Sequence, residues 1–273
     1  MEEIEMRADA AIVARGLAAS REKARGLIEA GLVTVNGSAI KKPAQKVREC
    51  AVLGVLGSEH PYVSRGGLKL EKALGVFDVD AHGRVCVDIG ASTGGFTDVL
   101  LQSGASLVYA VDVGTGQLNA RLLSDPRVVS MERVNARALD PGMFPQRPTL
   151  AVMDVSFISI KLILPAAFAM LGNDGRMITL VKPQFEAGRQ AVGKGGIVSR
   201  PEVHWQVLRD LVAFVPTLGW HVRAIDFSPI CGGDGNIEFL ADMAPEEAGM
   251  GAVSDDRIDE VVKEAHRALR EKR

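Results

Sequence analysis

The sequence has few cysteines, and the few it has form no pattern. Cys50, Cys86 and Cys231 lie far apart in the chain, and none belongs to a CxxC pair or has a histidine at metal-ligand spacing. An odd number of isolated cysteines argues against a disulfide framework and against a zinc site. We therefore expect reduced thiols and no bound metal.

Long hydrophobic runs are also missing. No stretch offers about 18 uninterrupted apolar residues, the length that a membrane-crossing helix needs, and the first residues, MEEIEMRADA, are acidic where a secretory leader is basic and then apolar. With 273 residues and 47% apolar content, the chain can nevertheless form one large domain and one small domain. These features predict a globular, cytoplasmic protein with no membrane partner.

Charge is distributed unevenly along the chain, although the formal net charge is only −2. The segment from Arg7 to Arg48 contains nine Lys or Arg residues and three acidic residues, a net charge of +6, which leaves −8 for the rest of the chain. A basic block of this size on an acidic chain indicates that one end meets a polyanion. On charge alone, ordinary solvated helix faces remain an alternative.

The basic segment is expected to fold as two short helices and a hairpin. Ser20 can cap a helix through REKARGLIEA that Gly31 ends, and Asn36-Gly37 separates two short strand-like segments, as in a two-residue hairpin turn. The pattern SREKARGLIEAGLVTVNG resembles the S4-type RNA-binding domain. The resemblance implies that exposed basic side chains meet RNA phosphates, which positions the RNA without selecting a sequence. The residues implied are Arg7, Arg21, Lys23, Arg25, Lys41 and Lys42.

A candidate linker follows this segment. The stretch 55-VLGSEHP-61 contains Gly, Ser and Pro and shows little periodicity. We predict an S4-type domain over residues 1–57, a linker over 58–63 and a second domain over 64–273. The sequence does not indicate an oligomeric state.

From Arg84 onward, short β-rich segments alternate with segments of helical spacing. The strand-like segments are VCVDIG, SLVYAVDVG, TLAVMDVS and RMITLVKP, and the helical ones are GFTDVLLQSG, GQLNARLL and ISIKLILPAAFAML. This alternation predicts an α/β domain in which helices cover both faces of a parallel sheet. In such a sheet, ligands bind beyond the carboxyl ends of the strands.

A nucleoside cofactor is predicted at this edge of the sheet. The first strand runs into 88-DIGASTGGF-96, whose glycines let the backbone approach a ligand. The second strand ends at Asp112, 22 residues after Gly90, where a carboxylate can accept hydrogen bonds from both ribose hydroxyls. The GxGxxG pattern of dinucleotide binders is not present, so S-adenosylmethionine, which has no pyrophosphate, is favoured over NAD. The predicted cofactor-binding residues are Ser64, Arg65, Gly66, Asp88, Gly90, Ala91, Ser92, Gly94, Gly95, Phe96, Asp112 and Asp154.

A second glycine-rich stretch, 182-KPQFEAGRQAVGKGGIVSR-200, comes close to a phosphate-binding loop. Four residues separate Gly188 from Gly193-Lys194, but Gly195 takes the place of the Ser or Thr that would hold magnesium. The preceding strand ends at Lys182 itself, and the next helix is expected near Pro201. We therefore interpret Phe185 to Arg200 as a mobile flap over the site and not as an ATP-binding loop.

Charged residues stand at unusual places in the large domain. Asp154 and Lys182 each end a strand, where an ordinary ion pair is the alternative to a role in the cleft. Glu238 lies in the apolar run NIEFL and, if buried, needs a cationic partner such as Lys182 or Lys69. In chain order, Lys69, Asp154, Lys182 and Glu238 resemble the catalytic tetrad of FtsJ-type ribose 2′-O-methyltransferases.

Longer segments extend this resemblance. The segments YVSRGGLKLEKAL, DIGASTGGFTDVLL, VYAVDVGTGQL, MDVSFISIKLILP and VKPQFEAGR closely resemble the haemolysin/TlyA family of S4-domain rRNA methyltransferases, over about residues 7 to 243. Departures at Cys231 to Asp234 and at LNARLLSD lie outside the tetrad. The family implies a Rossmann-like class I S-adenosylmethionine-dependent methyltransferase domain behind the S4 domain. It also implies methylation of a ribose 2′-hydroxyl, typically of a cytidine, in ribosomal RNA or ribosomal subunits.

The chemistry agrees with this implication. A sugar hydroxyl is a poor nucleophile near neutral pH, so a base must take its proton as it attacks the methyl group. We expect Lys182 to be this base, and Asp154 and Glu238 to orient the two lysines. With only two Trp and two Tyr, the chain is expected to recognise RNA by shape and phosphate contacts more than by base stacking.

Two other classes of function remain as alternatives. A non-catalytic RNA-binding factor for ribosome assembly could carry a vestigial cofactor pocket. A membrane-lytic haemolysin is the second alternative. The C-terminal SDDRIDEVVKEAHRALREKR, the segment best suited to a membrane surface, is more simply a helix whose apolar face packs on the large domain.

Overall fold

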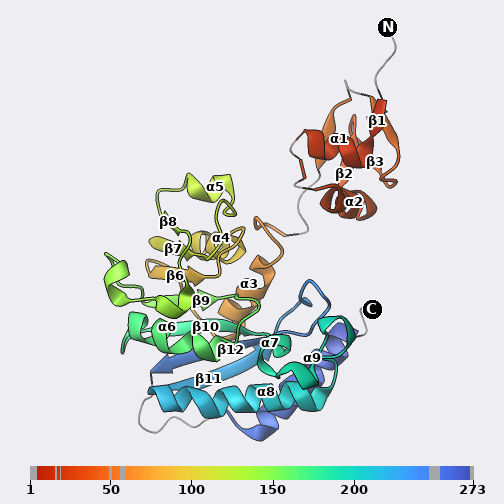
Figure 1. Ribbon diagram of the computed structural model, residues 1–273. Helices are drawn as coiled ribbons and strands as arrows, with labels where there is room; N and C mark the ends of the chain where they lie inside the picture. The colour runs from red at the N-terminus through yellow and green to blue at the C-terminus, as the bar shows by residue number, and fades with distance from the viewer. Residues whose placement is uncertain are drawn as a thin grey trace. The chain divides into compact units, whose positions relative to one another are not determined.

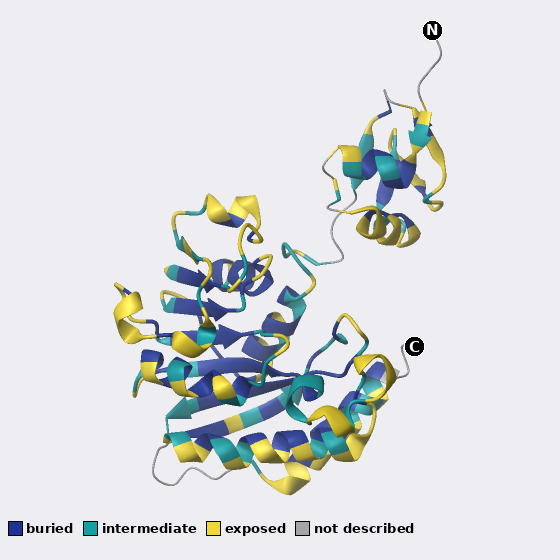
Figure 2. Cartoon of the chain, viewed as in Figure 1, coloured by how far each residue is buried: buried dark blue, intermediate teal, exposed yellow. Residues whose placement is uncertain are grey.

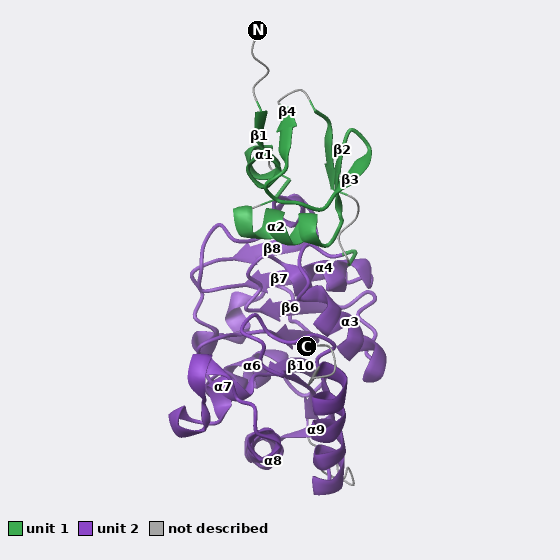
Figure 3. Ribbon diagram, turned by 90° about the vertical axis from the view of Figure 1, so that its right-hand side faces the viewer, with its two compact units in different colours: residues 1–61 green, residues 62–273 purple. Residues whose placement is uncertain are grey.

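The computed structural model divides the chain into two compact units, residues 1–61 and 62–273 (Figures 1 and 3). It describes residues 5–15, 17–18, 20–48, 51–55, 60–245 and 253–270. Cys50 and residues 58–59 of the predicted linker lie outside the described residues. The division falls inside that linker, whose exact bounds stay a prediction.

The first unit folds as the sequence predicts, with two helices packed on short strands. Its elements are β1 (Glu5–Arg7), α1 (Ala8–Ala14), α2 (Arg21–Glu29), β2 (Val33–Val35), β3 (Ser38–Ile40), β4 (Lys46–Arg48) and β5 (Leu53–Val55). Ser20 caps α2 by accepting a hydrogen bond from the backbone N–H of Lys23 at 3.2 Å. Asn36 and Gly37 have φ of 49° and 82° between β2 and β3, the combination that a type I′ hairpin turn requires.

The second unit is built on a seven-stranded sheet. In chain order the strands are β6 (Val85–Ile89), β7 (Leu107–Val111), β8 (Val128–Met131), β9 (Leu150–Met153), β10 (Arg176–Val181), β11 (Trp220–Phe227) and β12 (Phe239–Pro245). Their order across the sheet is β11-β12-β10-β9-β6-β7-β8. Strand β12 runs antiparallel to β10 and to β11, so the sheet is mixed and the expectation of a parallel sheet is wrong at this edge. The reason is that residues 228–238 join β11 directly to β12 without a crossover helix.

Helices cover both faces of this sheet, as predicted. The helices of the unit are α3 (Gly67–Val76), α4 (Gly95–Gln102), α5 (Ala120–Leu123), α6 (Leu164–Leu171), α7 (Pro183–Glu186), α8 (Pro201–Phe214) and α9 (Asp255–Arg270), and its 3-10 turns are η1 (Ala136–Ala138), η2 (Pro141–Met143), η3 (Ile160–Leu162), η4 (Arg189–Ala191), η5 (Lys194–Gly196) and η6 (Val215–Leu218). Alternate strand residues divide between two cores: Val87 packs with α6, α8 and α9, whereas Cys86 packs with α3 and α4. Figure 2 shows these strands as mostly buried.

The C-terminal helix packs on this domain, as its spacing predicts. The five apolar positions of α9 predicted to face the domain are buried: Ile258, Val261, Val262, Ala265 and Leu269. They belong to the same core as α8 and β11. In the part of the chain that the structure describes, no helix combines the length and the apolar character needed to span a membrane.

The segment after Lys182 differs from the flap expected there. A short helix, α7, begins directly at Pro183, because proline at the first helical position has the φ that a helix needs. Further along, the Asn236 side chain donates to the Gly196 carbonyl at 3.0 Å and accepts from the Val198 backbone N–H at 2.9 Å. The C-terminal half of the segment is therefore anchored to the β11–β12 connection before α8 starts at Pro201.

Candidate active site

The four tetrad residues lie on four different elements that meet at one edge of the sheet. Asp154 follows β9 and Lys182 follows β10, and these neighbouring strands are parallel, so their carboxyl ends are adjacent. Glu238 precedes β12, which runs in the opposite direction and so begins at the same edge. Lys69 comes from α3. The reversed strand that the sequence did not reveal is what brings Glu238 to this place.

The side chains form a chain of alternating charge. The Lys69 ammonium donates to Glu238 Oε2 at 2.5 Å and lies 3.6 Å from Asp154 Oδ2. The Lys182 ammonium lies 2.6 Å from Asp154 Oδ1. Of the two partners proposed for Glu238, Lys69 is therefore the one that the structure places against it. Because Lys69, Lys182 and Glu238 are all buried, this one-to-one pairing is what makes their desolvation tolerable.

Lys69 is held in its charged form. Burial acts to lower the pKa of its ammonium, but the carboxylates of Asp154 and Glu238 outweigh burial and raise the pKa above its usual value. A lysine with a raised pKa cannot accept a proton near neutral pH. Lys69 is therefore not suited to act as a base.

Two adjoining cavities open beside the network. The smaller cavity has a volume of about 210 Å³. Its lining comes from the segment before α3, from the glycine-rich stretch 88–96 (the glycine loop) and from the residues that follow β9 and β10: Ser64, Gly66, Gly90, Ala91, Ser92, Thr93, Gly95, Phe96, Asp154, Ser156 and Lys182. The larger, of about 500 Å³, includes Asp112, Val134, Asn135 and Phe157. They share Gly90, Ser92, Asp154 and Ser156, so Asp154 lies where the two cavities meet, and Lys182 lines the smaller one.

The conformation of the glycine loop depends on Gly90 and on the Asp112 carboxylate. Gly90 has φ of 85°, and a Cβ there would lie 2.6 Å from the Asp154 carbonyl oxygen, so only glycine fits against that strand end. The Asp112 carboxylate accepts hydrogen bonds from the backbone N–H groups of Ser92 at 2.8 Å and Gly114 at 2.7 Å. Asp112 therefore organises the loop in addition to presenting a carboxylate to the larger cavity.

Comparison with known proteins identifies the family to which the chain belongs. Residues 62–243 match the FtsJ-like methyltransferase family, and residues 6–53 match the S4 domain. The chain belongs to the FtsJ-like methyltransferase family. The predictions of the family, of an enzyme and of an α/β methyltransferase domain behind an S4 domain are thus confirmed.

Individual relatives cover almost the whole chain. The chain is 49% identical to the Bacillus subtilis (strain 168) protein YqxC over 98% of its own length and 96% of that protein. It is 46% identical to the 16S/23S rRNA (cytidine-2′-O)-methyltransferase TlyA of Mycobacterium tuberculosis, covering 86% of this chain and 88% of TlyA. A solved structure of a hemolysin-named protein from Streptococcus thermophilus has a TM-score of 0.79 and 46% identity, covering 99% of each chain.

Three predicted cofactor residues of this FtsJ-like domain are not among those that line the two cavities. Asp88 is fully buried and accepts hydrogen bonds from the Thr97 N–H at 2.9 Å and hydroxyl at 2.7 Å, and burial raises its pKa to about 7. It fixes the first turn of α4. Gly94, with φ of 93°, begins that helix, and Arg65 lies at the start of α3.

The structure also brings forward residues that sequence reasoning missed. Ser156 accepts a hydrogen bond from Lys182 Nζ at 2.9 Å. Phe157 is 92% exposed, has φ of 65°, and its ring lies 5.3 Å from that of Phe185. Each phenylalanine comes three residues after a tetrad residue, in MDVSF and in KPQF. That spacing is the signal in the sequence, and the numbers of Trp and Tyr alone do not show it.

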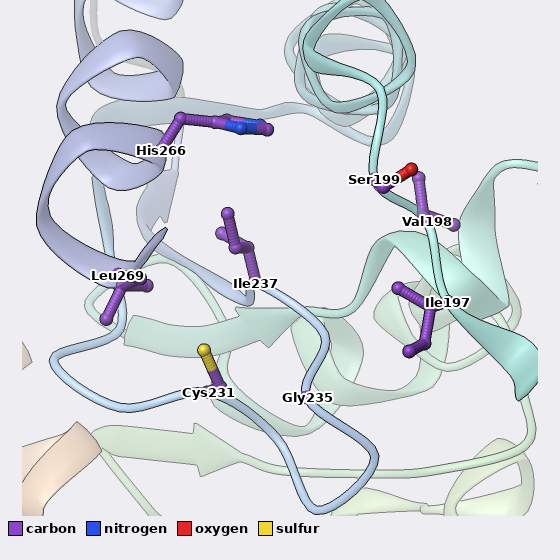
Figure 4. A pocket seen from close by; sticks show the side chains of 8 residues that line it. All are labelled: Ile197, Val198, Ser199, Cys231, Gly235, Ile237, His266 and Leu269. Carbon is purple, nitrogen blue, oxygen red and sulfur yellow. The ribbon is translucent and has the colours of Figure 1, made fainter. Parts of the chain in front are cut away.

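A third cavity lies apart from the tetrad. It has a volume of about 350 Å³ and is mostly apolar, and Figure 4 shows the side chains around it. They come from the end of the 183–200 segment, the β11–β12 connection and α9: Ile197, Val198, Ser199, Cys231, Gly235, Ile237, His266 and Leu269. Cys231, where the sequence departs from the family pattern, lines this cavity and neither of the two beside the tetrad.

The cations predicted to meet RNA are all exposed on the first unit: Arg7, Arg21, Lys23, Arg25, Lys41 and Lys42. Two of them are held by one buried carboxylate. Asp9, 1% exposed, pairs with Arg7 at 2.9 Å and with Arg21 at 3.3 Å. The hydrogen bond from Arg7 holds the pKa of Asp9 low, at about 2. The two guanidinium groups are therefore exposed to solvent while the buried Asp9 carboxylate fixes their orientation.

Proposed function

We propose that the protein transfers a methyl group from S-adenosylmethionine to a ribose 2′-hydroxyl of ribosomal RNA, with a cytidine as the target nucleotide. The observation that carries the proposal is the alternating Glu238–Lys69–Asp154–Lys182 network, whose Asp154 lines both of the adjoining cavities and whose Lys182 lines the smaller one. The cytidine and the ribosomal target come from the printed name of the Mycobacterium tuberculosis relative. A ribosomal substrate would place the protein in the cytoplasm.

The residues present fit S-adenosylmethionine. Gly90 lets the backbone of the loop lie against the end of β9, where a Cβ would be only 2.6 Å from the Asp154 carbonyl oxygen, and Asp112 offers a carboxylate to ribose hydroxyls in the larger cavity. Ser64, Gly66 and Gly95 would hold the methionine end in the smaller cavity. When bound, the cofactor supplies a methyl group already activated by its sulfonium sulfur. The protein's task is therefore to position and deprotonate the nucleophile.

In the proposed mechanism, Lys182 Nζ takes the proton of the ribose 2′-hydroxyl as its oxygen attacks the methyl carbon. The bound cofactor would supply the methyl group and keep the electron pair of its carbon–sulfur bond, and the proton would end on Lys182. Asp154, 2.6 Å away, stabilises the ammonium that forms. Lys69 stays charged and fixes Asp154 and Glu238 on either side of it. Lys69 and Glu238 are thus positioning residues, and Lys182 is the base.

Asp112→Ala is expected to weaken cofactor binding at least tenfold. The variant loses the proposed ribose contact and the two backbone hydrogen bonds that shape the glycine loop. Isothermal titration calorimetry with S-adenosylmethionine measures the effect. Asp125→Ala is the matched control, because Asp125 pairs with Arg127 at 2.8 Å and lines neither cavity. Unchanged affinity in Asp112→Ala would show that the ribose is held elsewhere.

RNA would be held at two places, each on its own unit. On the first unit, phosphates would meet the six exposed cations, with Arg7 and Arg21 oriented by Asp9. On the second unit, Phe157 presents an exposed ring beside the larger cavity. An exposed aromatic ring on strained backbone is a costly arrangement that a stacked base would explain.

Phe157→Ala is therefore expected to weaken RNA binding about tenfold, since stacking of a base on an aromatic ring contributes about 1–3 kcal/mol. Affinity is measured by titrating labelled ribosomal RNA at saturating cofactor. Phe157→Tyr keeps the ring and serves as the control, with affinity close to that of the unaltered protein. Equal RNA affinity in the alanine and tyrosine variants would remove Phe157 from the RNA site.

A non-catalytic assembly factor is the remaining rival. The paired network favours catalysis, because a vestigial site has no need to keep two buried lysines matched by two carboxylates. Rescue of a deletion strain by a catalytically dead variant would favour the assembly factor. A relative from Brachyspira hyodysenteriae, 44% identical over 86% of this chain, is named Hemolysin A, and no feature of the described residues supports extending that activity to this chain.

A further inference from the structure

Lys182 contacts two polar side chains of one loop, one in an ion pair and one in a hydrogen bond. Asp154 Oδ1 lies 2.6 Å from its Nζ, and Ser156 Oγ accepts a hydrogen bond from the same nitrogen at 2.9 Å. Both partners follow β9, whereas Lys182 follows the neighbouring β10. All three residues line the smaller cavity. One N–H of the lysine nitrogen is thus held by Ser156, and the Asp154 carboxylate lies against the same nitrogen as its ion-pair partner.

The contacts made by the N–H bonds of Lys182 decide the direction in which its lone pair can point. A neutral amine carries two N–H bonds and one lone pair. If Asp154 alone held the nitrogen, the lone pair and the second N–H could exchange places by rotation about the Cε–Nζ bond. With Ser156 accepting one N–H and the Asp154 carboxylate beside the nitrogen, rotation is restricted and the lone pair is directed away from both groups.

We propose that Ser156 is a positioning residue of the transfer reaction, which aims the lone pair of Lys182 at the ribose 2′-hydroxyl. The proposal rests on the proposed function of the same site and adds a residue outside the tetrad. The balance of the step is unchanged: the proton moves from the 2′-oxygen to Lys182 Nζ, and Ser156 keeps its own proton.

The Ser156 hydroxyl is not needed to hold the loop in place. The Ser156 side chain is exposed, and the loop around it is held by other bonds. The Glu186 carboxylate of α7 accepts hydrogen bonds from Ser159 Oγ at 2.7 Å and from the Ile160 backbone N–H at 2.8 Å. Removal of the Ser156 hydroxyl therefore leaves the β9 loop clamped to α7 and takes away a contact with Lys182.

The test is steady-state methyl transfer by full-length Ser156→Ala and Ser156→Thr, with ribosomal RNA or subunits that the unaltered protein methylates. We expect Ser156→Ala to lower kcat about ten- to a hundredfold, with the KM for cofactor and for RNA changed by less than about threefold. Ser156→Thr restores the hydroxyl and is expected to recover most of kcat. Ser106→Ala is the control, because Ser106 bonds the Gly83 and Arg84 carbonyls before β7, at the other edge of the sheet.

Each other outcome overturns a defined part of the account. A Ser156→Ala kcat within twofold of the unaltered protein, or a loss that falls wholly on the cofactor KM, overturns the positioning role while the methyltransferase proposal stands. Equal loss in the alanine and threonine variants also overturns it, since the hydroxyl would then be irrelevant. No transfer by the unaltered protein to any ribosomal RNA or subunit overturns the proposed function and, with it, the role of Ser156.

Discussion

Lys182→Ala is expected to lower the rate of methyl transfer about a thousandfold, while the affinities for cofactor and RNA stay within a few-fold. The reason is that a positioned general base contributes about 10²–10⁴ in rate, and Lys182 is the lysine of the tetrad that lines the smaller cavity. Single-turnover transfer of tritiated methyl measures the rate, and calorimetry measures cofactor binding.

Lys161→Ala is the matched control for this experiment. Lys161 lies in η3, a few residues beyond the β9 loop, and its ammonium sits 5.8 Å from the centre of the Phe214 ring, away from both cavities. Its removal is expected to leave transfer unchanged. A Lys182→Ala protein with undiminished single-turnover rate would take Lys182 out of the mechanism.

Glu238→Ala is expected to have the largest effect on stability. The substitution leaves the buried Lys69 ammonium without its 2.5 Å partner, and breaking a buried pair from one side costs about 3–5 kcal/mol. Glu238→Gln keeps an oxygen acceptor for Lys69 and should lose less. Both variants should also lose transfer activity, because Lys69 would no longer hold Asp154 in place.

The unfolding of the second unit can be followed separately. Trp205 and Trp220 are the two tryptophans of the chain and both lie in that unit, so their fluorescence in urea reports its transition without the first unit. Glu260→Ala is the control: Glu260 pairs with Arg257 on the exposed side of α9, where an ion pair contributes little. Equal unfolding midpoints for the Glu238 and Glu260 variants would contradict the buried pairing.

The tetrad could be proposed from the sequence because the four residues, in chain order, resemble the FtsJ-type tetrad, and the strand pattern agrees with this resemblance. Apolar runs that end in Asp154 and Lys182 mark neighbouring parallel strands, and a glutamate in an apolar run demands a cation. The sequence does not decide whether Lys69 or Lys182 pairs with Glu238. The direction of β12 decides which lysine lies against Glu238, and the hydrophobic pattern does not encode strand direction. The same gap produced the expectation of a parallel sheet.

The loop residues of the site were harder to predict from the sequence than the strand ends. Ser156 and Phe157 lie beyond the strand end, where period no longer tells which way a side chain points, and Phe157 adopts a left-handed φ that few residues of its kind adopt. The helix at Pro183 was missed for a related reason. Four residues are too few for a helical period, although proline after a strand end is a start signal.

The measurement that tests the central claim most directly is the position of the transferred methyl group. Ribosomal subunits that lack this modification are incubated with the protein and tritiated S-adenosylmethionine, and the labelled RNA is digested with alkali, which needs a free 2′-hydroxyl to cleave the chain. The account predicts label in an alkali-resistant dinucleotide that contains cytidine, and no label with Lys182→Ala. Label that is released in ordinary mononucleotides would place the methyl on a base and contradict the assignment of a ribose 2′-O-methyltransferase.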